Sequence, residues 1–134
     1  MRIERIDISI LDSLSSLAKR DERLRQNCDL RNSPDDQSQR MLNAVEPGSV
    51  VPIHRHRDSS ETVVCLRGKL LEMFYDDGGR LTHSIELSPE GPVIAYNITK
   101  GQWHSVKSLV SGTVIMECKD GAYSPLAPED VFEK

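Results

Sequence analysis

The sequence predicts an all-β domain, a sandwich or barrel, that is preceded by one amphipathic helix. Three observations favour this fold. After Gln39 the chain runs in short β-prone segments that Gly, Pro, Asp and Ser interrupt every roughly 8 to 12 residues, as in sandwiches and barrels. The length of 134 residues suits one hydrophobic core. Near the N-terminus, apolar residues recur at helical spacing instead.

The helix is expected over residues 9–20, with Ser9 as its N-cap. Its apolar stripe consists of Ile10, Leu11, Leu14, Leu17 and Ala18. The polar stretch that follows, to about residue 39, is interpreted as an extended connector. We therefore expect a single domain in three parts: helix and connector over 1–39, a β-barrel over 40–120, and a proline-rich surface tail over 121–134.

About eight strands are expected in the barrel. They lie in the segments RMLNAVEPG, SVVPIHRH, ETVVCLRG, KLLEMFYDDGG, RLTHSIELSPEG, PVIAYNITKG, WHSVKSLVSG and TVIMECKDG. YDDGGRL has the composition of a hairpin turn. No internal repeat or low-complexity linker divides the chain.

Composition excludes several classes of protein. A net charge of -4 argues against a nucleic-acid partner, which requires clustered Lys and Arg. No apolar run approaches the roughly 18 to 20 residues that span a bilayer, and no signal-peptide pattern is visible, so we expect a cytoplasmic protein without a membrane partner. Three cysteines without a CxxC pair indicate buried free thiols rather than a disulfide framework.

The segment GSVVPIHRHRDSSETVVCLRG, residues 48–68, carries the clearest chemical signal. Because side chains two apart on a strand share a face, His54 and His56 are expected to point the same way. Glu61 follows a turn in RDSS, from which the next strand can present it beside them. Two imidazoles and a carboxylate that converge from adjacent strands suit a first-row divalent metal. His104, just after the Gly101 turn, is a candidate fourth ligand.

This segment resembles the first motif of the cupin superfamily at each defining position: Gly48, His54, His56, Glu61 and Gly68. The second cupin motif is matched by Gly101 and His104, whereas Thr99 and Ser108 replace its usual proline and asparagine. The resemblance implies a double-stranded β-helix, or jelly-roll barrel, with the N-terminal helix packed outside. It also implies pairing into a homodimer.

Nearly the whole chain resembles the small WbuC-type cupins, through LNAVEPG, HRH, ELSPEGPV, GQWHSV and GAYSP. That family is associated with surface-polysaccharide genes, which implies a sugar or nucleotide-sugar intermediate as the small-molecule ligand. Two function classes stay open. One is a metalloenzyme, such as a metal-dependent isomerase, epimerase or oxygenase-type cupin, and the other is a non-catalytic metal or small-ligand binding module.

The expected cofactor is one divalent transition metal ion held by His54, His56, Glu61 and His104. Zn, Fe, Mn, Ni and Co all suit this ligand set. An octahedral site would leave two positions open for water or substrate. Weaker candidates for lining the pocket are Cys65, Tyr96 and Trp103, and no catalytic residue is assigned. His83 lacks a partner at ligand spacing and is expected to be exposed.

Overall fold

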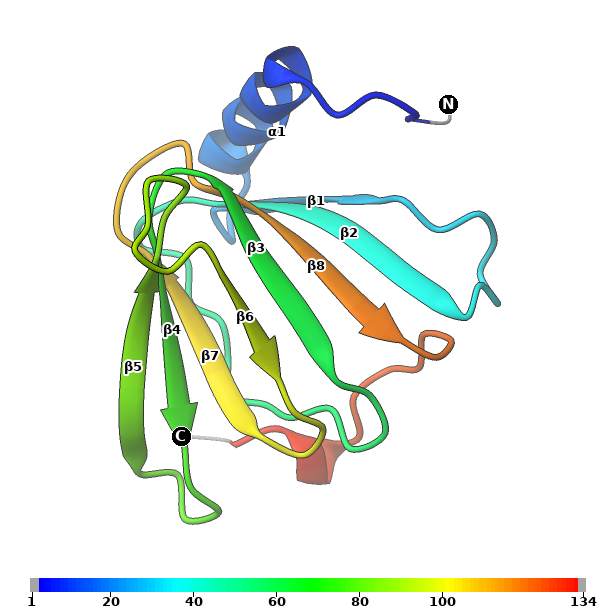
Figure 1. The fold of residues 1–134 in the computed structure, drawn as a ribbon, viewed down its shortest axis with the longest axis vertical. Helices are drawn as coiled ribbons and strands as arrows, with labels where there is room; N and C mark the ends of the chain where they lie inside the picture. The colour runs from blue at the N-terminus through cyan, green and yellow to red at the C-terminus, as the bar shows by residue number, and fades with distance from the viewer. Residues whose placement is uncertain (1–2, 133–134) are drawn as a thin grey trace.

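Two antiparallel β-sheets and one N-terminal helix make up the fold, which we describe from a computed structural model for residues 3–132 (Figure 1). The five-stranded sheet has the order β1-β2-β8-β3-β6, and the three-stranded sheet has the order β5-β4-β7. The elements are α1 (Ile8–Arg20), β1 (Arg25–Asp29), β2 (Ser38–Val45), β3 (Glu61–Arg67), β4 (Leu70–Tyr75), β5 (Leu81–Leu87), β6 (Ala95–Ile98), β7 (Trp103–Ser108), β8 (Val114–Asp120) and the 3-10 turn η1 (Pro128–Asp130).

The main core lies between the two sheets. Val63, Ile98 and Ile115 point into it from the five-stranded sheet, and Leu70 and Phe74 face them from β4. Strands β3 and β4 alternate buried and more exposed positions, the period of two that a half-buried strand requires. The all-β, jelly-roll architecture predicted from the sequence is confirmed.

Helix α1 packs on the outer face of the five-stranded sheet, as predicted. Leu11, Leu14 and Ala18 bury against Leu42 and Val114 of β2 and β8. These helix positions are three and four residues apart, which places them on one stripe. Leu17, which we expected on this stripe, is instead 44% exposed.

The predicted N-cap was wrong by two residues. Asp7, rather than Ser9, precedes the first turn in an extended conformation, and its Oδ1 accepts a hydrogen bond of 3.1 Å from the Ile10 amide. We expect Asp7→Ala to lower the free energy of unfolding by about 1 kcal/mol, because one helix amide loses its acceptor. Ser9→Ala, inside the helix, is the matched control and should change it by less than about 0.5 kcal/mol. Equal losses in chemical denaturation would contradict this assignment.

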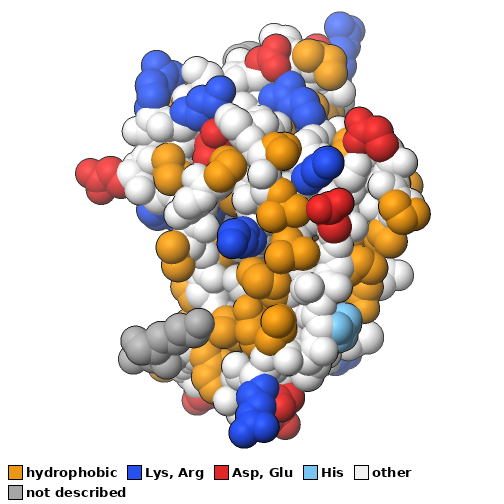
Figure 2. Space-filling view, turned by 90° about the vertical axis from the view of Figure 1, so that its left-hand side faces the viewer, with side chains coloured by type: hydrophobic (Ala, Val, Ile, Leu, Met, Phe, Trp, Pro, Cys, Tyr) orange, Lys and Arg blue, Asp and Glu red, His pale blue; other side chains and the backbone are white. Residues whose placement is uncertain are grey.

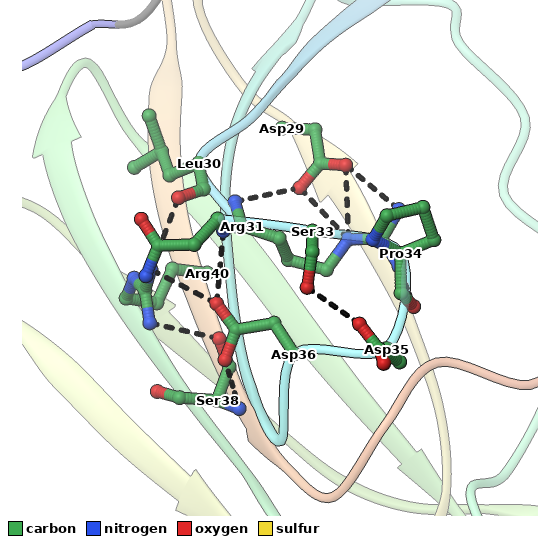
Figure 3. A network of polar contacts seen from close by, with 10 residues as sticks. Asp29, Leu30, Arg31, Ser33, Pro34, Asp35, Asp36, Ser38 and Arg40 are labelled. Carbon is green, nitrogen blue, oxygen red and sulfur yellow. Dashed lines mark hydrogen bonds and ion pairs between the residues drawn. The ribbon is translucent and has the colours of Figure 1, made fainter.

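Residues 25–29 depart from the sequence prediction. They were expected in a connector, but they form β1, which pairs along its whole length with β2. The loop between the two strands is held by side chains: Asp29 accepts hydrogen bonds from Arg31, and Asp36 accepts from Arg40 and from the Asn32 amide (Figure 3).

Residues 48–60 also differ from the prediction, because they do not form a regular strand. Only His54 makes bridges, one to His104 and one to Val131. The chain is extended just around His54, where its amide donates to the His104 carbonyl at 3.0 Å and its carbonyl accepts from the His104 amide at 2.8 Å. The alternation used to align His54 with His56 therefore applies locally, without a complete strand.

Hydrophobic side chains form a band over the outer face of the three-stranded sheet, on the side where β5 and β4 lie (Figure 2). An apolar groove of about 560 Å³ lies there, lined by Val50, Pro52, Met73, Tyr75 and Phe132 among others. Among the described residues, no helix is long and apolar enough to cross a bilayer.

Candidate metal centre

The four predicted ligands meet at one place. One possible ligand atom from each of His54, His56, Glu61 and His104 lies within 4.8 Å of the others. Bonds of about 2.1 Å to a common ion would place neighbouring ligand atoms about 3 Å apart and opposite ones about 4.2 Å apart. Small side-chain movements would therefore bring all four onto one ion.

Three separate parts of the fold position these side chains. The reciprocal backbone hydrogen bonds between residues 54 and 104 place His54 beside the start of β7. His56 is fixed by the amide of Gly101, which donates to its carbonyl at 2.8 Å. Glu61 begins β3 and pairs with Lys119 of β8 and Ile98 of β6, which turns its side chain inward.

Hydrogen bonds at Nδ1 orient two of the imidazoles. Nδ1 of His54 lies 2.8 Å from the Pro52 carbonyl oxygen, and Nδ1 of His104 lies 2.9 Å from the Gln102 carbonyl oxygen. A carbonyl can only accept, so each Nδ1 carries the proton and each Nε2 is left with a lone pair. Such backbone bonds to the far nitrogen are typical of metal-binding histidines.

The contact between His104 and Glu61 points to a cation. Nε2 of His104 lies 2.9 Å from Oε1 of Glu61, and the same oxygen lies 3.6 Å from Nε2 of His56. If the imidazoles are neutral and protonated at Nδ1, their Nε2 atoms and the carboxylate oxygen present lone pairs to one another. A proton or a metal ion between them removes the repulsion, and Glu61 and His104 are only 4% and 3% exposed.

The protonation states favour a metal. Burial is the main reason that the pKa values of His54 and His56 are lowered to about 4, so both imidazoles are neutral at pH 7. Burial alone would raise the pKa of Glu61, but its contact with His104, together with the nearby charge of Lys119, holds it below its usual value. Neutral imidazoles beside a carboxylate are the forms that bind divalent transition metals.

A cavity of about 1020 Å³ opens from this cluster along the inner face of the five-stranded sheet. Most of the residues that line it are polar or charged, and Arg55 and Arg57 are among them. Beyond the four predicted ligands, its polar lining includes Arg25, Asn27, Gln39, Asn43, Glu72, Glu117, Lys119 and Asp130.

The three candidates for lining the pocket lie elsewhere, and none is among the residues around this cavity. Cys65 shares the inward face of β3 with Glu61 but lies four residues further along, in the apolar core, with Tyr96 packed against that core. Trp103 is buried under the guanidinium of Arg55, 4.5 Å from its ring centroid, and against Phe132. His83 is exposed, as predicted, and stacks on Phe74.

Sequence reasoning missed three acidic residues of the cavity. Glu72 lies on β4, and Glu117 lies on β8, where Nδ2 of Asn43 donates to it at 3.2 Å. Burial, with the nearby charge of Glu61, raises the pKa of Glu117. Asp130, in the segment predicted to be a surface tail, accepts hydrogen bonds from Arg55 at 2.9 Å and Arg57 at 2.6 Å. The sequence offered one signal for Glu72 and Glu117, because each lies an even number of residues from inward-facing residues of its strand. It offered no signal for Asp130.

Solved structures with this fold include sugar-related and metal-containing proteins. KdgF from Halomonas sp. is 14% identical, with a TM-score of 0.61 over 75% of this chain and 81% of its own. The capsular polysaccharide assembling protein CapF from Staphylococcus aureus is 21% identical, with a TM-score of 0.63 over 80% of this chain. Oxalate decarboxylase from Bacillus subtilis, a protein with Mn(II) centres, is 16% identical, with a TM-score of 0.59 over 81% of this chain.

This chain covers 29% of the CapF chain and 27% of the oxalate decarboxylase chain, so it corresponds to one part of each. At these identities the likeness shows the fold, which is that of the cupins. No curated protein matches the sequence. The sequence model of one family, described as a domain of unknown function (DUF6016), matches residues 6–87, which include His54, His56 and Glu61. The chain is thus a cupin-fold member of the DUF6016 family.

Proposed function

We propose that this protein is a metal-dependent cupin that holds one divalent transition metal ion through His54, His56, Glu61 and His104 and acts on a small polar molecule in the adjoining cavity. The observation that carries the proposal is the convergence of these four side chains, with Nε2 of His54 and His104 freed by hydrogen bonds at Nδ1. Three imidazole nitrogens and one carboxylate oxygen suit Mn, Fe, Co, Ni and Zn.

Such an ion supplies Lewis acidity, polarising a carbonyl or hydroxyl oxygen of a bound molecule. The residues of the chain orient the metal ligands and keep water away from them. The carbonyls of Pro52 and Gln102 fix the planes of two imidazoles. The apolar core beneath the cluster excludes water from Glu61 and His104, which strengthens every electrostatic interaction there.

The cavity supports a sugar-like ligand. Asn27, Gln39, Asn43 and Lys119 line it and present donors and acceptors at the spacing of adjacent strands, as a molecule with several hydroxyl groups requires. The sequence resemblance to WbuC-type cupins and the fold shared with a capsular polysaccharide assembling protein agree with a sugar or nucleotide-sugar intermediate. The size and polarity of the cavity favour an enzyme over a binding module that has only kept its metal ligands.

The same resemblance predicts a homodimer. The apolar groove on the outer face of the three-stranded sheet supports this, because Val50 there is 81% exposed, and Met73 and Tyr75, which also line it, project from β4 away from the core. This groove borders the polar cavity, because Val51, Pro52 and Val106 line both of them.

The direct test is the metal content of the protein purified without added metal. Inductively coupled plasma mass spectrometry should find about one divalent transition metal ion per chain after dialysis. In protein reloaded with Mn(II), enhanced relaxation of water protons should report coordination positions that exchange with solvent. Protein that retains no metal would disprove the metal proposal. Bound metal without exchangeable water would favour the non-catalytic alternative.

A further inference from the structure

Glu72 occupies a position that the fold would ordinarily give to an apolar residue. It lies on the inward face of β4 between Leu70 and Phe74, both of which belong to the core between the sheets. Its exposed fraction is 0%, equal to that of Leu70. A fully buried glutamate is rare unless it is paired or binds something.

No group in the described part of the chain pairs with this carboxyl. Neither Oε1 nor Oε2 of Glu72 has a hydrogen-bond partner among the described residues, although both are shielded from solvent. Burial raises the pKa of Glu72 to about 9, and the nearby carboxylates of Glu61 and Glu117 add to the rise. In the metal-free protein the group is therefore a neutral carboxylic acid at pH 7, with one hydrogen to donate and no acceptor for it within residues 3–132.

The carboxyl belongs to the deep end of the cavity that holds the candidate metal centre. Glu72 lines this cavity together with Glu61 and His104, and all three are at most 4% exposed. The inner face of the five-stranded sheet brings Glu61, Glu117 and Lys119 to the same cavity, and β7 brings His104. Oε1 of Glu61 lies 2.9 Å from Nε2 of His104, and Asn43 donates to Glu117, whereas Glu72 has no polar partner within residues 3–132.

We infer that Glu72 contacts the molecule held in this cavity, and that its carboxyl group donates a hydrogen bond to a carbonyl or carboxylate oxygen of that molecule. This inference rests on the proposed function, since it needs a ligand beside the metal. It defines the ligand class: a small molecule with an acceptor oxygen that approaches the metal from the β4 side. A neutral acid suits that oxygen, because an ionised glutamate would repel it.

Two substitutions separate this role from a structural one. Glu72→Met keeps the volume and flexibility of the side chain but has no donor, whereas Glu72→Gln keeps a neutral donor. The metal-free E72M variant should be more stable than the wild type, with a melting temperature about 4 °C higher, because an unpaired buried polar group is removed. Glu86→Gln, at an exposed position of β5, is the matched control and should change nothing.

The binding readout uses acetate as the probe of the cobalt-loaded protein. Acetate binding, followed through the visible spectrum of Co(II), should weaken about tenfold in E72M, as expected for one lost hydrogen bond to a charged group. In E72Q it should weaken by less than about threefold.

Equal acetate affinity in the wild type and E72M would overturn the inference, as would a loss in E72Q as large as that in E72M. A metal-free E72M variant that is less stable than the wild type would also overturn it, because the carboxyl would then have a partner in the fold. These results are distinct from failure of the proposed function itself, which would appear as a wild-type protein that binds no cobalt.

Discussion

His104→Ala is expected to weaken metal binding at least about 100-fold. A change in a residue that only orients a metal ligand already costs up to about 100-fold in affinity, and the loss of a ligand itself should cost no less. The imidazole of His104 is held from both sides, by the Gln102 carbonyl at Nδ1 and by Glu61 at Nε2. Removing it takes away one of four ligand atoms and leaves the buried Glu61 carboxylate without its closest partner, which should also lower the free energy of unfolding by about 1 to 3 kcal/mol. Competition between the protein and a chelator for Co(II) measures the affinity, and chemical denaturation measures the stability.

His83→Ala is the matched control for this prediction. His83 is exposed on β5 and stacks on Phe74, with ring centroids 4.6 Å apart, and it is not among the four clustered side chains. Its removal should leave the Co(II) affinity within about twofold of the wild type. If both variants bound Co(II) as tightly as the wild type, His104 would not be a ligand. If both lost affinity to the same extent, the effect would be a general consequence of destabilisation.

The spacing of the ligands could be read from the sequence because it is local. His54 and His56 lie two residues apart, Glu61 follows after a turn, and each is fixed by backbone geometry within a few residues. The argument succeeded although residues 48–60 are not a strand, since it needed only a few extended residues near His54. That these side chains converge is now a property of the structure, whereas their role as ligands is still a prediction.

The residues that sequence reasoning missed depend on contacts between distant segments. Glu72 has the parity of a core residue, and only the packing of the opposite sheet shows that its carboxyl has no partner. Cys65 has the same parity as Glu61, but the core closes over that end of β3 before the cavity reaches it. β1 has few apolar residues, so only its pairing with β2 identifies it as a strand. Periodicity predicts which way a side chain points and says nothing about what lies opposite.

The C-terminal segment shows the same limit most clearly. It is proline-rich and polar, and its sequence predicts a surface tail, yet it runs along the histidine segment (Figure 1). The Arg55 amide donates to the Asp130 carbonyl at 3.0 Å, and the Phe132 amide donates to the Ile53 carbonyl at 2.9 Å. Arg55 and Arg57 alternate with His54 and His56 along the chain, so fixing the two arginines also fixes the backbone from which the histidines project.

Asp130→Asn is accordingly expected to weaken Co(II) binding about 10- to 100-fold, the range for residues that orient metal ligands. Oδ1 of Asp130 accepts from Nε of both arginines, and these hydrogen bonds, chiefly that of Arg57, lower the pKa of Asp130. An asparagine carries no charge, so it holds two guanidinium groups more weakly. Chelator competition gives the affinity, and the visible spectrum of bound Co(II) shows whether the ligand geometry has changed.

Comparing the loss of Co(II) affinity with the change in unfolding free energy tests whether Asp130 positions the histidine segment. The side chain of Arg57 is 50% exposed, so solvent screens its ion pair with Asp130, and the pair should contribute little to folding. A large loss of Co(II) affinity with a small change in unfolding free energy therefore fits a residue that orients the histidine segment. Glu129→Gln tests the neighbouring carboxylate, which is exposed and makes no hydrogen bond within residues 3–132, and it should leave both quantities unchanged. A D130N protein that binds Co(II) normally would show that the histidine segment holds its shape without this clamp.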